Sequence, residues 1–435
     1  MVKKNNRSKR TIGLFGAIAI GIGGMVGGGI FAVLGEAVSL AHGATFVAFF
    51  VAGVVALFTA YAYAKLSVCY QNRGGTVVFI DNAFNHNLLS GSVNLMLWLS
   101  YLVTIALYAT AFASYGATFF PQPHSMYVEK GLMVVAILLP TWINLVSASL
   151  VSKSESTIVL IKVLLLVLII LSGMGYVEVD RLSVTQWEAP MGIVTAGMII
   201  FVAYEGFELI ANAAEEIQSP QKNLPRAFYG SVLFVIVLYM LISVVCVGVV
   251  SQEALMEAKD YALAIAAKPA LGELGFTLVA LAALLSTFSA INATIYGNAR
   301  LGFSLAKEGV LPKILSKEKR DIPNIGVFVT SMLSLILALT TPLTEIAIIG
   351  SAGFLLIFMI VNLSALKLAK EIGAQKIILL LGTLLSLFAL LSLLYHTYES
   401  NRNALFVFLG FVSLSILFEL LYGRWVRGHF LKRSY

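Results

Sequence analysis

The run Gly23-Gly-Met-Val-Gly-Gly-Gly-Ile-Phe31 lies inside an apolar segment, 12–34, that is long enough to cross a membrane. Glycine costs about 1 kcal/mol relative to alanine in a helix interior, so three in a row are unusual for a plain helix. One interpretation is close helix packing, because the run contains small residues four positions apart. The other is unwound backbone, whose exposed N–H groups at the start of a half-helix bind a carboxylate.

A second segment favours the unwound interpretation. The stretch Phe201-Val-Ala-Tyr-Glu-Gly-Phe-Glu208 places a glycine between two carboxylates inside the apolar run 190–214. Ionisable groups at membrane depth are rare and face a cavity rather than lipid. The two segments are the first and sixth of the expected spans. Paired broken helices in corresponding positions of two halves indicate a transport site.

The composition indicates that lipid is the main solvent of this chain. Of its 435 residues, 59% are hydrophobic and 12% are charged, whereas soluble domains carry about 25% charge. A helix needs about 20 apolar residues to cross the hydrocarbon core, and this length predicts an all-α, polytopic membrane protein with about twelve transmembrane helices. The expected spans are 12–34, 44–66, 88–112, 128–148, 154–176, 190–214, 227–250, 272–303, 325–341, 345–366, 376–398 and 404–422.

The charges between the spans predict the orientation. On one side of the membrane, the connections and both tails hold 23 of the 29 Lys and Arg residues, and the opposite side holds 5. Positive charge gathers in cytoplasmic loops, so we expect both termini in the cytoplasm and the protein in the plasma membrane. The net charge of +7 comes from these loops and does not indicate a nucleic-acid partner. We interpret the segment after the basic stretch Lys3–Arg10 as the first span rather than a signal peptide, because no cleavage site follows.

Short connections between the spans limit the classes of function. The longest polar connections, 176–190, 251–271 and 304–324, are too short for a soluble domain, which argues against a receptor or a membrane-anchored enzyme. Cys69 and Cys246 have neither metal-ligand nor disulfide spacing, and no phosphate-binding loop for ATP is present. We expect no cofactor and no enzymatic activity, and a site within the membrane.

Lys162 is a third intramembrane feature, about 12 Å from the edge of the segment 154–176 along a helix. Either its flexible stem lifts the ammonium to the interface, or the ammonium is buried. Burial disfavours the charged form, so a buried ammonium can release and take up a proton. Ser286 and Ser289, one turn apart, are candidate acceptors for this ammonium. The alternative is that their hydroxyls bond to their own helix.

Several motifs together resemble the amino acid–polyamine–organocation (APC) superfamily of transporters. They are Gly27-Gly-Gly-Ile-Phe31, Tyr204-Glu-Gly-Phe-Glu208, Glu216-Ile-Gln-Ser-Pro-Gln-Lys-Asn-Leu-Pro-Arg226, Asn292-Ala-Thr-Ile-Tyr-Gly-Asn-Ala-Arg300 and Ser304-Leu-Ala-Lys-Glu-Gly-Val-Leu-Pro312. The resemblance covers nearly the whole chain. It implies a LeuT-like fold in a single membrane domain, with inverted five-helix repeats at 12–176 and 190–366 and two more helices at 376–422. The segments around Lys162 and 264–312 most resemble proton-coupled, broad-specificity amino-acid transporters of this superfamily.

The resemblance also implies roles for individual residues. The substrate carboxylate is expected on amides of the first broken helix, and the substrate ammonium on carbonyls of Met25, Val202 and Glu205. The expected substrate-binding residues are Met25, Gly27, Gly28, Gly29, Ile30, Phe201, Val202, Tyr204 and Glu205. Lys162 is expected where a sodium ion sits in sodium-coupled relatives. The expected proton-coupling residues are Lys162, Gly23, Ser286, Ser289 and Glu208.

The hypothesis from the sequence is a symporter that moves amino acids by alternating access, with protons, the amino-acid substrate and the lipid bilayer as its partners. Glu205 and Glu208 either attract a cationic substrate side chain or titrate themselves. An exchanger of the same fold, which swaps one amino acid or amine for another, is the nearest alternative, and cationic amino acids or polyamines are the substrates of one version of it. A non-transporting membrane sensor is a further alternative.

Overall fold

The computed structural model describes residues 10–72, 74–121, 126–146, 148–319 and 322–427, without the side chains of 148–156, 259 and 427. Most of the predicted cytoplasmic tails, 1–9 and 428–435, therefore lies outside the described residues. Within the described ranges the regular secondary structure is helical, and β-pairing is limited to three isolated bridges. The α-helices are α1 Leu14–Met25, α2 Gly29–Ala41, α3 Thr45–Cys69, α4 Thr76–Phe84, α5 Leu88–Ala117, α6 Met126–Val146, α7 Ala148–Gly173, α8 Pro190–Ile199, α9 Leu209–Asn212, α10 Pro220–Val249, α11 Gln252–Glu257, α12 Ala262–Lys307, α13 Asn324–Thr340, α14 Leu343–Lys367, α15 Lys376–Ser400 and α16 Arg402–Tyr422.

In the described part of the chain, ten helical stretches are long and apolar enough to cross a membrane. The helices α1 and α2 form one further span that is bent by 49°. The helix α13 is apolar but shorter, with 17 residues, and coincides with the expected span 325–341. The prediction of an all-α, polytopic membrane protein is confirmed, whereas the twelve-span layout with two inverted repeats stays a prediction.

Several expected span boundaries differ from the observed helix ends, among them those of the first and eighth spans. The first span does not stop at residue 34, because α2 continues to Ala41. Glu36 lies inside α2, where its carboxylate is buried and accepts a hydrogen bond from the Thr344 hydroxyl at 3.1 Å. The expected span 272–303 begins at the kink in α12, at Gly272, but ends too early, because α12 continues to Lys307.

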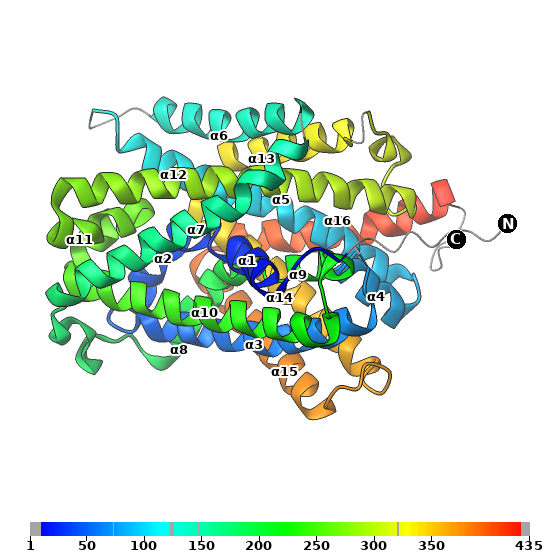
Figure 1. Ribbon diagram of the computed structural model, residues 1–435, viewed down its shortest axis with the longest axis horizontal. Coiled ribbons are helices and arrows are strands. Elements are labelled where there is room, and N and C mark those ends of the chain that lie inside the picture. The colour runs from blue at the N-terminus through cyan, green and yellow to red at the C-terminus, as the bar shows by residue number, and fades with distance from the viewer. Residues whose placement is uncertain (1–9, 73, 122–125, 147, 320–321, 428–435) are drawn as a thin grey trace.

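The long helices run along the long axis of the molecule, with α11 and α4 at opposite ends (Figure 1). The centre of the bundle is α5, whose most apolar stretch is 94% buried; α5 packs against α12, α6 and α14. The corresponding stretches of α6 and α16 are 28% and 22% buried. Their apolar outer faces suit contact with lipid.

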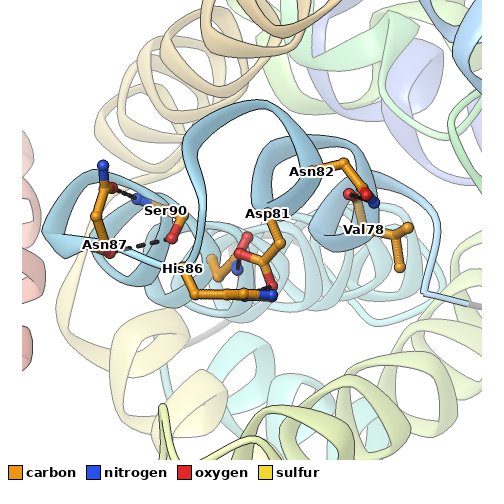
Figure 2. A network of polar contacts seen from close by, with 7 residues as sticks. Val78, Asp81, Asn82, His86, Asn87 and Ser90 are labelled. Atoms are coloured by element: carbon orange, nitrogen blue, oxygen red, sulfur yellow. Dashed lines mark hydrogen bonds and ion pairs between the residues drawn. The ribbon is translucent and has the colours of Figure 1, made fainter. Parts of the chain in front are cut away.

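A polar network holds the C-terminal end of α4 (Figure 2). The Asp81 carboxylate is buried, accepts a hydrogen bond from Asn94 Nδ2 at 3.0 Å, and lies 3.1 Å from His86 Nδ1. The Asn87 side chain then caps α5 by accepting from the Ser90 N–H at 3.1 Å. The network fixes the position of α4, whose first residues line the cavity described below.

Candidate functional site

The first membrane span is broken at the glycine run. The helix α1 ends at Met25 and α2 begins at Gly29, with the bend between them. The first N–H groups of α2 have no acceptor within their own helix, so this end of α2 suits an anion. The ring of Tyr108 lies directly against Gly28, where a Cβ atom would overlap it.

The span that contains α8 is broken at Gly206. A 3₁₀ turn, Ile200–Tyr204, follows α8, and the chain then becomes extended at Glu205, with φ −63° and ψ 143°. Gly206 has φ 118°, which residues with a side chain rarely adopt. The chain resumes as the short helix α9. The α-helical hydrogen-bond ladder is therefore interrupted at the position that the sequence indicates.

The two breaks touch each other through backbone atoms. A Cβ on Gly24 would lie 2.6 Å from the carbonyl oxygen of Gly206. A Cβ on Gly29 would lie 2.6 Å from the Cα of Ala203. Neither approach leaves room for a larger residue. The glycines therefore permit close packing as well as unwinding, so both interpretations of the glycine run apply.

Hydroxyl groups from two other helices bind the backbone of the breaks. The Tyr239 hydroxyl on α10 donates to the Met25 carbonyl at 2.7 Å and has the Ala203 carbonyl at 3.2 Å, so it reaches both broken spans. The Ser351 hydroxyl on α14 accepts from the Val202 N–H at 3.0 Å. These contacts satisfy polar backbone groups that unwinding would leave unpaired.

Lys162 reaches the first break from α7. Its side chain is 4% exposed, and Nζ donates to the Gly23 carbonyl at 2.9 Å. The ammonium is thus directed into the protein and does not snorkel to the interface. Ser289 lines the same cavity as Lys162, whereas the Ser286 hydroxyl donates to the Gly27 carbonyl.

Glu205 and Glu208 are both buried but have different surroundings. Glu208 Oε2 accepts from the Gly206 N–H at 2.7 Å, and Oε1 accepts from the Tyr101 hydroxyl at 3.1 Å. Glu205 Oε2 accepts from the Tyr108 hydroxyl at 3.2 Å. Both tyrosines belong to α5 and lie two turns apart, so one face of α5 contacts both carboxylates.

A cavity of about 510 Å³ extends from the breaks towards the ends of α4 and α12. Its volume falls in the range of about 300–1,000 Å³ that is usual for small-molecule sites. Four of the expected site residues line it: Gly23, Lys162, Glu205 and Ser289. The far end is lined by Gly74, Thr76, Glu216, Arg300 and Glu308.

The other expected site residues are outside the cavity lining. They are Met25, Gly27, Gly28, Gly29, Ile30, Phe201, Val202, Tyr204, Ser286 and Glu208. Two of their side chains are engaged elsewhere: the Tyr204 hydroxyl donates to the Phe49 carbonyl at 2.8 Å, and the Phe201 ring packs against Phe358. The Tyr108 ring covers Gly28, so the amides of the first break are closed off in this conformation.

Sequence reasoning missed four residues of this site. They are Tyr101, Tyr108, Tyr239 and Ser351. The seven-residue spacing of the first two was the available signal, because it places both hydroxyls on one helix face. Tyr239 and Ser351 are single polar residues in apolar helices, and nothing in their spacing indicates a role in the site.

Comparison with known proteins adds to this geometry. Residues 12–418 match the sequence model of the amino acid permease family. The chain belongs to this family. An uncharacterised protein of Methanocaldococcus jannaschii is 34% identical over 434 residues, which cover 98% of each chain. The inner membrane transport protein YbaT of Escherichia coli is 32% identical over 98% of this chain and 99% of its own. The methylthioribose transporter of Bacillus subtilis is 26% identical over 85% of this chain and 83% of its own.

Membership of this family confirms the predicted relationship to the APC superfamily. The permease is a multi-pass membrane protein of amino-acid transport and not an enzyme. The broken spans and the cavity between them are the structural elements on which a transport mechanism can be built.

Proposed function

We propose that this permease is a symporter that carries amino acids together with protons, with Lys162 as the proton-binding group. The observation that carries the proposal is the buried Lys162 ammonium, 2.9 Å from the Gly23 carbonyl of the first broken span. Because this ammonium contacts the broken span and lines the cavity, a change in its protonation can change the position of the broken span.

The substrate would bind between the two breaks. Its carboxylate is held by the N–H groups of Gly28, Gly29 and Ile30 at the start of α2, where the helix dipole favours negative charge. Its ammonium faces the carbonyls of the second break. The Tyr108 ring lies on Gly28, so binding requires this ring to move aside.

The cavity corresponds to one state of an alternating-access cycle. Its lining includes Arg300 and Glu308, which lie within the basic connection 300–320. By the positive-inside rule this connection is cytoplasmic, so the proposed state is inward-facing. In this state the opposite side would be closed by packed side chains such as Phe31, on the first turn of α2, whose ring contacts that of Tyr115 with centroids 6.0 Å apart.

The protonation of Lys162 would decide how firmly α1 is held to α7. A hydrogen bond from a charged donor contributes about 1.5–3 kcal/mol. A differential energy of that size shifts an equilibrium between two conformations by about 10- to 150-fold. Loss of the proton removes the charge, weakens the contact with Gly23 and favours a different position of the first broken span.

The test is uptake of labelled amino acids by proteoliposomes under an imposed pH gradient. The wild-type protein should accumulate substrate, and Lys162→Met should lose the response to the gradient. Lys268→Met is the matched control, because Lys268 is more exposed and pairs with Glu273 at 3.0 Å outside the cavity. Proton-dependent accumulation by Lys162→Met would remove the mechanism.

The same vesicles separate symport from exchange. An exchanger takes up label only when the vesicles are preloaded with amino acid, whereas a symporter also fills empty vesicles under a pH gradient. Because one relative is named for methylthioribose, this thiosugar belongs among the substrates tested. Uptake of methylthioribose in preference to every amino acid would contradict the proposal.

A further inference from the structure

The proposed mechanism uses the backbone carbonyl of Glu205 but gives no role to its buried side-chain carboxylate. Its side chain is 3% exposed and lines the cavity at the second break. Glu208 differs, because its two oxygens accept from the Gly206 N–H and the Tyr101 hydroxyl and it is outside the cavity lining. Of the two carboxylates, Glu205 is therefore the one that a molecule in the cavity can reach.

The Glu205 carboxylate can accept more hydrogen bonds than the protein supplies. Among the described residues, its hydrogen-bond partner is the Tyr108 hydroxyl, 3.2 Å from Oε2. An ionised carboxylate has about four acceptor positions, and its burial is costly without compensating donors. Because Glu205 lines the cavity, a donor that enters the cavity and reaches its carboxylate would stabilise the ionised group.

The charges around the cavity favour a donor with a positive charge. Three carboxylates line it, Glu205, Glu216 and Glu308, against the two cations Lys162 and Arg300. Charges attract more strongly in a cavity with low-dielectric walls than in water, so the surplus of carboxylates draws in cations.

We propose that Glu205 is the counter-ion for a positively charged nitrogen of the substrate and determines which substrate charges are accepted. The inference rests on the proposed transport function and adds a substrate-contacting side chain to it. Tyr108 positions this carboxylate through its hydroxyl, while its ring covers Gly28. One side chain of α5 thus contacts both the ammonium end and the carboxylate end of the substrate site.

The nitrogen is the α-ammonium of an amino acid or the ammonium of a cationic side chain, and four ligands separate these sources. Hexanoate, norleucine, 6-aminohexanoate and lysine share a six-carbon chain and differ in which nitrogens they carry. Their dissociation constants are measured by calorimetry on the purified full-length protein and on Glu205→Gln. We expect the variant to bind lysine and one of the two single-nitrogen ligands about 10- to 100-fold more weakly, with hexanoate unchanged within twofold.

The pattern of losses identifies the nitrogen. Pairing with the α-ammonium weakens norleucine and lysine but not 6-aminohexanoate. Pairing with a side-chain ammonium weakens lysine and 6-aminohexanoate but not norleucine. Equal weakening of all four ligands, or of none, would overturn the proposal. Glu273→Gln is the control, because this carboxylate is exposed and outside the cavity, and it should bind all four ligands as the wild type does.

If Glu205→Gln does not fold, binding of the same four ligands to the wild-type protein tests the pairing with a substrate nitrogen. Hexanoate that binds as tightly as the best nitrogen-bearing ligand would overturn the pairing without any variant. Failure of the protein to bind or transport any amino acid would contradict the proposed function itself. Transport of amino acids with no charge-dependent loss in Glu205→Gln would contradict the role of Glu205 alone.

Discussion

Gly206→Ala tests whether the two breaks meet through bare backbone. At φ 118° an alanine is strained, at a cost of about 1–3 kcal/mol. Its Cβ would lie 2.6 Å from the Gly24 Cα, and overpacking of a filled interior costs about 1–3 kcal/mol more. Together these costs reach about 2–6 kcal/mol, a large part of the about 5–15 kcal/mol that stabilises a typical folded protein. We expect a clear fall in the thermal unfolding midpoint of the detergent-purified protein and loss of transport.

Two other glycine variants separate backbone strain from packing. Gly24→Ala keeps its helical backbone and adds only the clash with the Gly206 carbonyl, so it should cost about 1–3 kcal/mol. Gly131→Ala on α6 would meet nothing within 4 Å and should stabilise the helix by about 0.5–1 kcal/mol. All three midpoints are measured by scanning fluorimetry. A Gly24→Ala protein as stable as Gly131→Ala would refute the direct contact between the breaks.

Three further substitutions test the groups that hold the breaks and α4. Tyr239→Phe removes a hydroxyl that contacts both broken spans. It should lower the free energy of unfolding by about 0.5–1.5 kcal/mol and slow transport in the vesicle assay. An unchanged thermal midpoint and an unchanged transport rate would contradict the role of this hydroxyl. Ser351→Ala leaves the Val202 N–H without its acceptor and should lower the free energy of unfolding by about 1–3 kcal/mol. Its thermal midpoint should therefore fall below that of Tyr239→Phe. A higher midpoint for Ser351→Ala than for Tyr239→Phe would contradict this role of Ser351. Asp81→Ala removes the carboxylate that contacts His86 and should accelerate hydrogen–deuterium exchange in α4. Unchanged exchange in α4 would contradict the role of the network in Figure 2.

The breaks are predictable from sequence because their residues are rare in membrane helices. Three glycines in a row at 27–29 and the two carboxylates around Gly206 conflict with a plain, lipid-embedded helix. Such conflicts between local sequence and surroundings are expected at functional sites. Lys162 belongs to the same class, since its depth along the segment follows from counting residues.

The partners of the breaks are not predictable in the same way. Tyr108, Tyr239 and Ser351 are residue types that occur throughout membrane helices, and their roles depend on how each helix is rotated about its axis. The difference between Glu205 and Glu208 depends on side-chain direction as well. Glu36 on α2 illustrates the same limit, because its buried carboxylate contacts the hydroxyl of Thr344, which lies 308 positions later in the chain.

The central claim is that amino acid and proton cross together through Lys162, and proton movement itself tests it most directly. Vesicles containing the protein and a pH-sensitive dye in their lumen receive labelled amino acid outside, with no imposed gradient. We predict that the lumen acidifies as the wild-type protein takes up substrate and that Lys162→Met abolishes this acidification. A lumen that stays at constant pH while label enters through the wild-type protein would contradict the account.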